Sequence, residues 1–368
     1  MILQIYSNFG LGLRPLRRAL PAVAFFAGFL WDALTLGRSV GPLDLWILAG
    51  YLAGAGGLLW FLGKRQLAIS TLAPLPAEPG QPTEQAPWWR ESGPYFLLQF
   101  LFGGLFSALF IFYFKSSSHF LAFVWALVLG MLLVANEFLE DRYRRFTLTW
   151  ALFGLCAMLL LNFVVPHVVG SISVLWFVLS TLAGAGLAHG LHLRTPGQPG
   201  LIRPVWAIAA GLLLAYFLDV IPPVPLVNKD IAVGHALAKS NGDYVLRQEK
   251  TPWWVFWRRV SKELHVKPGE RIYCVSAVFA PRGLDTRLYH RWSRYDDERG
   301  WVTTSHIGFG LAGGREGGYR GYTWKQNLAP GEWKVAVETE NGHTVAVHRF
   351  ELSAEPLADD AGMVEKRF

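Results

Sequence analysis

Long apolar runs fill most of the first 221 residues of the chain. A bilayer core of about 30 Å is crossed by roughly 20 residues of α-helix, and seven runs approach that length. The pattern therefore predicts a membrane-embedded all-α bundle of about seven transmembrane helices. The predicted spans are Leu20–Leu36, Leu45–Leu62, Pro94–Phe114, Phe120–Asn136, Phe146–Val165, Ser171–Ala188 and Pro204–Val220.

After residue 221 the apolar runs give way to short segments that alternate apolar and polar positions. In Glu332–Thr339, for example, Trp333, Val335 and Val337 share one face, as expected for a strand with one buried side. Asn341-Gly342 then predicts a hairpin turn. We expect strands at Tyr244–Gln248, Arg271–Phe279, Arg287–Tyr295, Trp301–Ile307, Tyr319–Lys325, Glu332–Thr339 and Thr344–Leu352.

Seven short strands in this segment predict an all-β, immunoglobulin-like sandwich. The predicted organisation is a transmembrane region at 1–221 followed by an extracytoplasmic β domain at 222–368. The proline-rich stretch 64–93 inside the first region predicts a cytoplasmic linker. The prolines of Pro222–Pro225 form a spacer before the β domain.

Composition supports this division. The 368 residues are 52% hydrophobic and 17% charged, and the mean hydropathy is +0.29, which excludes a disordered chain. Residues 222–368 hold 21 of the 34 Lys and Arg and 18 of the 27 Asp and Glu. With only two cysteines, Cys156 in a span and Cys274 in a strand, we expect no disulfide and a buried Cys274.

Basic residues in the loops between spans predict the orientation, because they favour the cytoplasmic side. A cytoplasmic N-terminus puts eleven Lys and Arg inside and only two, Arg38 and Lys115, outside. With seven spans, the β domain then lies outside the cytoplasm.

Three acidic residues at or near the ends of predicted spans, Asp32, Glu137 and Asp219, are candidate intramembrane polar sites. Glu137 is best explained as part of a helix that continues into water with charged neighbours. Asp32 and Asp219 both fall toward the outer leaflet. His189 and His192 stand one turn apart without a carboxylate or cysteine partner nearby, so we predict no metal site.

The β domain also resembles a known family. The motifs are Pro222–Leu226, Tyr273, Val278–Pro281, Tyr289–Trp292, Gly313–Thr323 and Pro330–Val335, with Asn136-Glu137-Phe138 in the preceding spans. They resemble the bacterial family catalogued as domain of unknown function 2914, in which such a domain follows several spans. The resemblance supports this architecture. It implies no activity and no catalytic residues.

Gly313–Tyr322 is the most unusual segment, with five glycines, two arginines and two tyrosines in ten residues. Glycine-rich backbone and arginine can together bind an anion, although a glycine-bent connection between strands explains the segment as well. The candidate ligand- or partner-binding residues are Arg315, Tyr319, Arg320 and Tyr322, with His290 and Trp292 on one face of a neighbouring strand. A structural, hydrogen-bonded histidine is the alternative for His290.

An aromatic and basic segment follows the last span at a short distance. Trp and Arg favour the membrane interface, so this segment is a candidate surface anchor, with packing on the sandwich as the alternative. Its residues are Trp253, Trp254, Trp257, Arg258 and Arg259. The net charge of +3 on residues 222–368 is too small to predict nucleic-acid binding.

The sequence contains no convincing catalytic set and no cofactor motif. We therefore predict a non-enzymatic inner-membrane protein whose periplasmic sandwich binds an envelope protein, a glycan or a lipid head group. Besides the bilayer, no partner is identified, and the oligomeric state stays open. The alternative is a transporter or an envelope-lipid-modifying enzyme with a site between helices and outer domain, using Asp32, Asp219 and His290.

Overall fold

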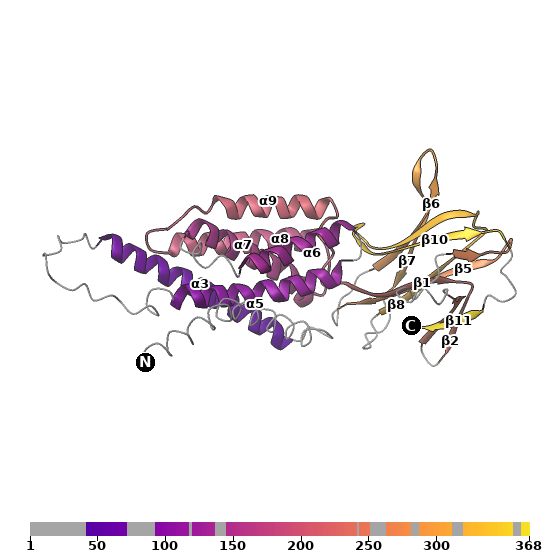
Figure 1. Ribbon diagram of the computed structural model, residues 1–368, viewed down its shortest axis with the longest axis horizontal. Helices are drawn as coiled ribbons and strands as arrows, with labels where there is room; N and C mark the ends of the chain where they lie inside the picture. Colours follow the sequence, from indigo (N-terminus) through magenta and orange to yellow (C-terminus); the bar gives the residue numbers. More distant parts are fainter. Residues whose placement is uncertain are drawn as a thin grey trace, which may run out of the picture. The chain divides into compact units, whose positions relative to one another are not determined.

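The structure is a computed structural model of the chain, shown in Figure 1. It describes residues 42–71, 93–117, 120–136, 145–240, 243–250, 263–280, 287–310, 319–355 and 362–368. The chain divides into two compact units. One comprises 1–112, 126–164 and 178–214, and the other comprises 113–125, 165–177 and 215–368. The helices supply most of the first unit, and all the strands belong to the second.

The described residues contain six helices before the first strand. They are α3 (Pro42–Thr71), α5 (Gly93–Ser116), α6 (Phe120–Asn136), α7 (Phe146–Val169), α8 (Val174–Arg194) and α9 (Arg203–Phe217). Each coincides with a predicted span to within four residues, except that α3 continues nine residues beyond Leu62 and α8 six residues beyond Ala188. The predicted span Leu20–Leu36 lies outside the described residues.

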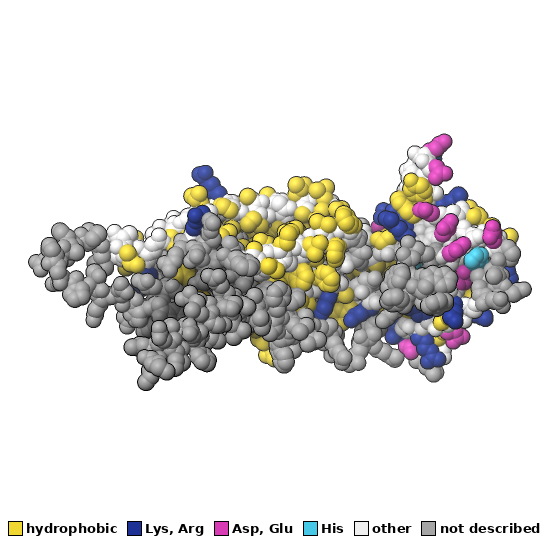
Figure 2. Space-filling model, viewed as in Figure 1, with side chains coloured by type: hydrophobic (Ala, Val, Ile, Leu, Met, Phe, Trp, Pro, Cys, Tyr) yellow, Lys and Arg dark blue, Asp and Glu magenta, His cyan; other side chains and the backbone are white. Residues whose placement is uncertain are grey.

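The prediction of about seven transmembrane helices is not supported. Four of the six described helices, α3, α5, α7 and α8, are long and apolar enough to cross a membrane, whereas α6 and α9 have 17 and 15 residues. At 1.5 Å per residue, a straight helix of 15 residues is shorter than the hydrocarbon core. Hydrophobic side chains cover much of the visible surface of these helices in Figure 2, which is typical of a membrane protein.

The predicted linker 64–93 was placed too early, because residues 64–71 continue α3. Lys64 and Arg65 end the apolar run without ending the helix, and the helix-forming residues Gln66, Leu67 and Ala68 follow them. Residues 72–92 lie outside the described residues.

Small residues bring helices of the first unit close together. A Cβ atom at Gly184 of α8 would lie 2.6 Å from the backbone Cα of Met158 in α7, so only glycine permits this approach. Close by, Asn162 of α7 bonds the hydroxyl groups of Ser180 and Thr181 in α8. These buried polar groups satisfy one another, as apolar surroundings require.

Eleven strands follow. They are β1 (Val227–Gly234), β2 (Ala236–Ser240), β3 (Asp243–Glu249), β4 (Glu263–His265), β5 (Arg271–Phe279), β6 (Arg287–Asp296), β7 (Gly300–Gly310), β8 (Tyr319–Gln326), β9 (Gly331–Thr339), β10 (Thr344–Ser353) and β11 (Met363–Arg367). All seven predicted strands are present, each within three residues at either end. β1, β2, β4 and β11 were not predicted.

The strands form three sheets, with orders β4-β10-β9-β6-β7, β1-β5-β8 and β11-β3-β2. Within β9, Trp333, Val335 and Val337 pack in the main core with residues of β1, β5, β6 and β10, as the alternation predicted. A second, smaller core joins Val275 and Ala277 of β5 to residues of β1 and β3. The sheet β1-β5-β8 therefore has a core on each face, and the third sheet adds a layer to the predicted sandwich.

Candidate functional site

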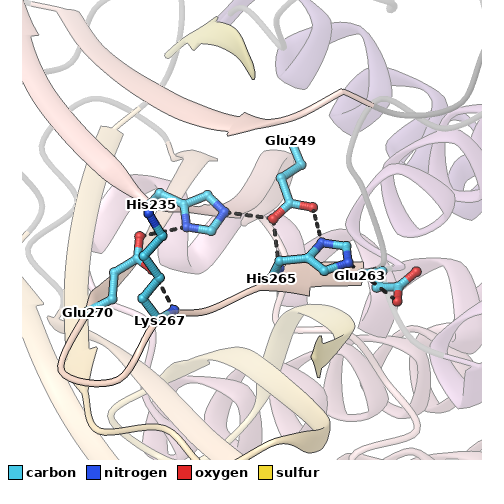
Figure 3. Close-up of polar contacts among 6 residues, drawn as sticks. All are labelled: His235, Glu249, Glu263, His265, Lys267 and Glu270. Atoms are coloured by element: carbon cyan, nitrogen blue, oxygen red, sulfur yellow. Dashed lines mark hydrogen bonds and ion pairs between the residues drawn. The ribbon is translucent and has the colours of Figure 1, made fainter. Parts of the chain in front are cut away.

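A chain of alternating histidines and glutamates lies where strands of all three sheets meet (Figure 3). His235 is the single residue between β1 and β2, and Glu249 ends β3. His265 ends β4, and Glu270 closes the turn before β5. We call these four residues the His–Glu chain.

Glu249 lies between two imidazoles. Its Oε1 accepts hydrogen bonds from His235 Nε2 at 2.9 Å and from the backbone N–H of His265 at 2.7 Å, and its Oε2 faces His265 Nδ1 at 3.0 Å. On its other side, His235 Nδ1 lies 2.9 Å from Glu270 Oε1. Glu270 Oε2 accepts a hydrogen bond from the backbone N–H of Lys267 at 2.9 Å. Both ring nitrogens of His235 therefore face carboxylate oxygens.

This arrangement favours the charged forms. Burial alone disfavours a charged imidazolium, but the hydrogen bonds to Glu249 and Glu270 outweigh it and raise the pKa of His235 above its ordinary value. For Glu249, burial alone raises the pKa, yet the hydrogen bonds from His235 and His265 lower the pKa overall. When His235 is protonated, it forms a buried ion pair with Glu249, with side chains only 8% and 6% exposed.

The His–Glu chain is built to hold strands together. Its hydrogen bonds run between its own members and to nearby backbone. The oxygen and nitrogen atoms of these side chains therefore face one another and do not surround an empty position for a ligand. Among the described residues, no group of three or more His, Cys, Asp or Glu is placed to hold a metal ion. Because its members lie in or directly beside strands of all three sheets, the chain acts as a clamp between them.

The clamp makes stability depend on pH. A raised pKa of His235 stabilises the fold below the unfolded value of about 6.5, and this contribution is lost as pH rises through the folded pKa. The lowered pKa of Glu249 stabilises the fold above about 4.5, and that contribution is lost as pH falls. We expect the β domain to open more readily at pH 8 than at pH 6, by at most tenfold per pH unit because one proton is involved.

Alkylation of the buried thiol Cys274 in a full-length Cys156→Ala variant measures this opening. At each pH the alkylation rate is divided by that of a small free thiol, which corrects for the pH dependence of the alkylation reaction itself. His235→Gln cannot take up the proton and should flatten the profile between pH 6 and pH 8. An unchanged slope in that variant would assign the pH dependence to other groups.

His290 and Trp292 share one face of β6, as predicted, and both side chains are fully buried. The ring nitrogens of His290 are hydrogen-bonded to Ser276 Oγ and Thr323 Oγ1, each at 2.9 Å. Trp292 Nε1 donates to the same Thr323 Oγ1 at 3.1 Å. Burial lowers the pKa of His290 to about 3, so the ring is neutral. Their placement matches the structural alternative, because a side chain buried in the core cannot meet a ligand at the surface.

The other described candidates lie on β8. Tyr322 is 42% exposed and packs against Tyr244 of β3, with ring centroids 5.4 Å apart. Arg320 is held by Asp243 at 2.6 Å. Tyr319 packs beside the main core instead. Trp324, which was not predicted as a site residue, is 44% exposed on the same face of β8 as Tyr322. Arg315 lies outside the described residues.

Of the remaining candidates, Asp219 alone lies in the part of the chain that the structure describes. The predicted membrane-interface residues Trp253, Trp254, Trp257, Arg258 and Arg259, and the acidic residues Asp32 and Glu137, lie outside the described residues. Asp219, in the second unit, accepts a hydrogen bond from the backbone N–H of Thr344 at 3.2 Å and lies 3.3 Å from His343 Nδ1. The ring nitrogens of His290 are instead hydrogen-bonded to Ser276 and Thr323.

No sequence motif predicted the His–Glu chain, because its members are spread over 36 positions, from 235 to 270. Three of the strands beside them, β1, β2 and β4, were also not predicted. The signal that the sequence offered was an enrichment of histidine in the β domain, since six of the ten histidines follow residue 222. Knowledge of the strand pairing was needed to bring them together.

One family model matches part of the β domain. Residues 285–352 match the family described as Protein of unknown function (DUF2914). This stretch contains Tyr289–Trp292, Gly313–Thr323 and Pro330–Val335, whereas the other quoted motifs precede it. No curated protein matches the chain.

Solved structures show only weak similarity. An immunoglobulin-like protein from Pseudomonas aeruginosa is 11% identical, with 34% of this chain and 97% of that chain covered and a TM-score of 0.20. A β-glucosidase from Listeria innocua is 12% identical, with 31% and 17% covered and a TM-score of 0.19. An alkylpurine DNA glycosylase from Pseudomonas fluorescens is 12% identical, with 84% and 97% covered and a TM-score of 0.18.

Proposed function

We propose that this chain is a bacterial inner-membrane protein that uses its β domain, in the periplasm, for non-enzymatic recognition of an envelope component. The observation that carries the proposal is the exposed aromatic face of β8. Tyr322 and Trp324 are both more than 40% exposed on this face. Arg271 lies over the Trp324 ring at 4.6 Å.

Rigid aromatic side chains suit recognition because they bury a large apolar area and lose little conformational entropy on binding. Arginine stacked on an aromatic ring keeps its donors available at the rim. Of the three ligand classes considered above, a glycan fits this face well, because sugar rings present apolar C–H faces beside hydroxyl groups.

The first test concerns orientation. Single cysteines at Ser240 and Gln81, in full-length protein without the two native cysteines, are treated with a membrane-impermeant maleimide in cells with a permeabilised outer membrane. We expect labelling at 240 and protection at 81. The reverse pattern would put the β domain in the cytoplasm and defeat the proposal.

The second test concerns the β8 face. We expect the double variant Tyr322→Ala/Trp324→Ala to lose at least tenfold in binding to isolated cell-envelope glycan, measured with full-length protein in nanodiscs. The matched control is Met363→Ala/Val364→Ala, which removes two similarly exposed apolar side chains of β11. Equal binding by both variants would remove the β8 face from the recognition surface.

A further inference from the structure

The outer face of the five-stranded sheet carries a second aromatic and basic cluster, distinct from the β8 face. Trp301 of β7 lies at its centre. Lys334 Nζ is 4.4 Å and the Arg349 guanidinium carbon is 5.7 Å from the centroid of its ring. Tyr295, across from Trp301 in the β6–β7 pairing, meets it edge-on at 5.3 Å and is 42% exposed. We call Trp301, Lys334, Arg349 and Tyr295 the Trp301 cluster.

The strand register explains this convergence. Arg349 of β10 is paired with Lys334 of the neighbouring strand β9, and Lys334 is in turn paired with Ser293 of β6. Ser293 is small and buried, which leaves room for the Trp301 ring to reach across it to both cations. The sheet itself thus brings two positive charges over one indole.

These two cations lack acidic partners. Neither Lys334 nor Arg349 makes an ion pair within 4 Å among the residues that the structure describes. The nearby carboxylate of Glu338 is bound to Arg291 at 2.6 Å. Burial and the charges of Arg291 and Arg349 lower the pKa of Lys334, and the carboxylate of Glu338 offsets this only in part, so positive charge predominates at this point.

An anion at the Trp301 cluster would relieve this repulsion. A carboxylate or phosphate accepts charge-assisted hydrogen bonds from both Lys and Arg, while Tyr295 offers an exposed ring for stacking. The exposed Glu332 and Glu351 follow on the same face of β9 and β10. They repel a dense polyanion and favour a ligand with isolated charges.

We infer that the Trp301 cluster is a binding subsite for an acidic saccharide, in which a carboxylate engages Lys334 and Arg349 and a sugar ring stacks on the aromatic side chains. The inference rests on the proposed recognition function and names its ligand chemistry. It uses a different surface from β8, so the two can fail separately.

Calorimetric titration of full-length protein in nanodiscs of neutral lipid tests the subsite. The probe is a hyaluronan tetrasaccharide, which alternates glucuronic acid with a neutral sugar, and the neutral comparison is the N-acetylglucosamine tetramer. We expect the acidic tetrasaccharide to bind at least tenfold more tightly. Equal affinity, or binding of inorganic phosphate without the tetrasaccharide, would overturn the inference.

Variants assign the binding to these residues. Lys334→Ala/Arg349→Ala should weaken binding of the acidic tetrasaccharide at least tenfold. The control Lys239→Ala/Arg247→Ala removes the same charge from exposed positions on β2 and β3 of the third sheet and should leave binding within twofold. If both pairs lose affinity equally, general charge explains the binding and the subsite is wrong. Tyr322→Ala/Trp324→Ala should leave it unchanged, which separates this result from that of the β8 face.

Discussion

Replacement of Glu249 by alanine is expected to destabilise the β domain by about 3–5 kcal/mol, the cost of removing one partner from a buried ion pair. The carboxylate is bonded to His235, to His265 and to the backbone N–H of His265. Without it, these donors stay buried and lose their acceptor. The loss affects strands of all three sheets, since β3 carries Glu249 and the partners adjoin β1 and β4.

Pulsed alkylation of Cys274 across a urea gradient measures this change in full-length Cys156→Ala protein. Glu263→Ala is the matched control. Glu263 is 61% exposed and its carboxylate lies as far as 3.9 Å from His265 Nε2, and such surface pairs contribute about 0–1 kcal/mol. Glu249→Gln keeps the size of the side chain and should fall between the two. A Glu249→Ala midpoint equal to that of Glu263→Ala would refute the clamp.

Trp292→Ala is expected to cost about 3–5 kcal/mol, the usual range for removing a buried large aromatic side chain. Trp292 is fully buried, donates to Thr323 and meets Phe350 edge-on with ring centroids 6.3 Å apart. Deleting the ring leaves a cavity in the main core between the sheets. The same alkylation experiment should show exposure of Cys274 at a much lower urea concentration.

The control for this substitution is Trp324→Ala, which removes the same side chain from an exposed position on β8. Surface substitutions of this kind usually change stability by no more than about 0.5 kcal/mol. If the two variants opened at the same urea concentration, Trp292 would not hold the core that the structure assigns to it.

Alternation predicted most of the strands that pack in the main core, although β1, which contributes Ile231 and Val233, was not predicted. In β9 the pattern Trp333, Val335, Val337 is unbroken, and a period of two is visible without any knowledge of the partners. β2, by contrast, is mostly exposed, and β4 has only three residues. Such edge strands form because a neighbour offers hydrogen bonds, and sequence alone does not display that neighbour.

The sites show the same limit. His290 was predicted to lie on one strand face with Trp292, and this is confirmed, but its two hydroxyl partners come from β5 and β8. The His–Glu chain and the Trp301 cluster likewise depend on the register between strands distant in sequence. Residue type suggested aromatic and basic chemistry in the β domain, whereas the positions of the interacting groups follow from pairing.

The two cysteines of this chain are both free and buried, one in α7 and one in β5. No covalent cross-link therefore holds the β domain, and hydrophobic packing together with the hydrogen-bonded clamp supplies its cohesion. Burial also raises the pKa of the Cys274 thiol, which keeps it protonated and unreactive toward oxidants. The domain can consequently mature without thiol-oxidising enzymes and keep its fold when the redox potential around it changes.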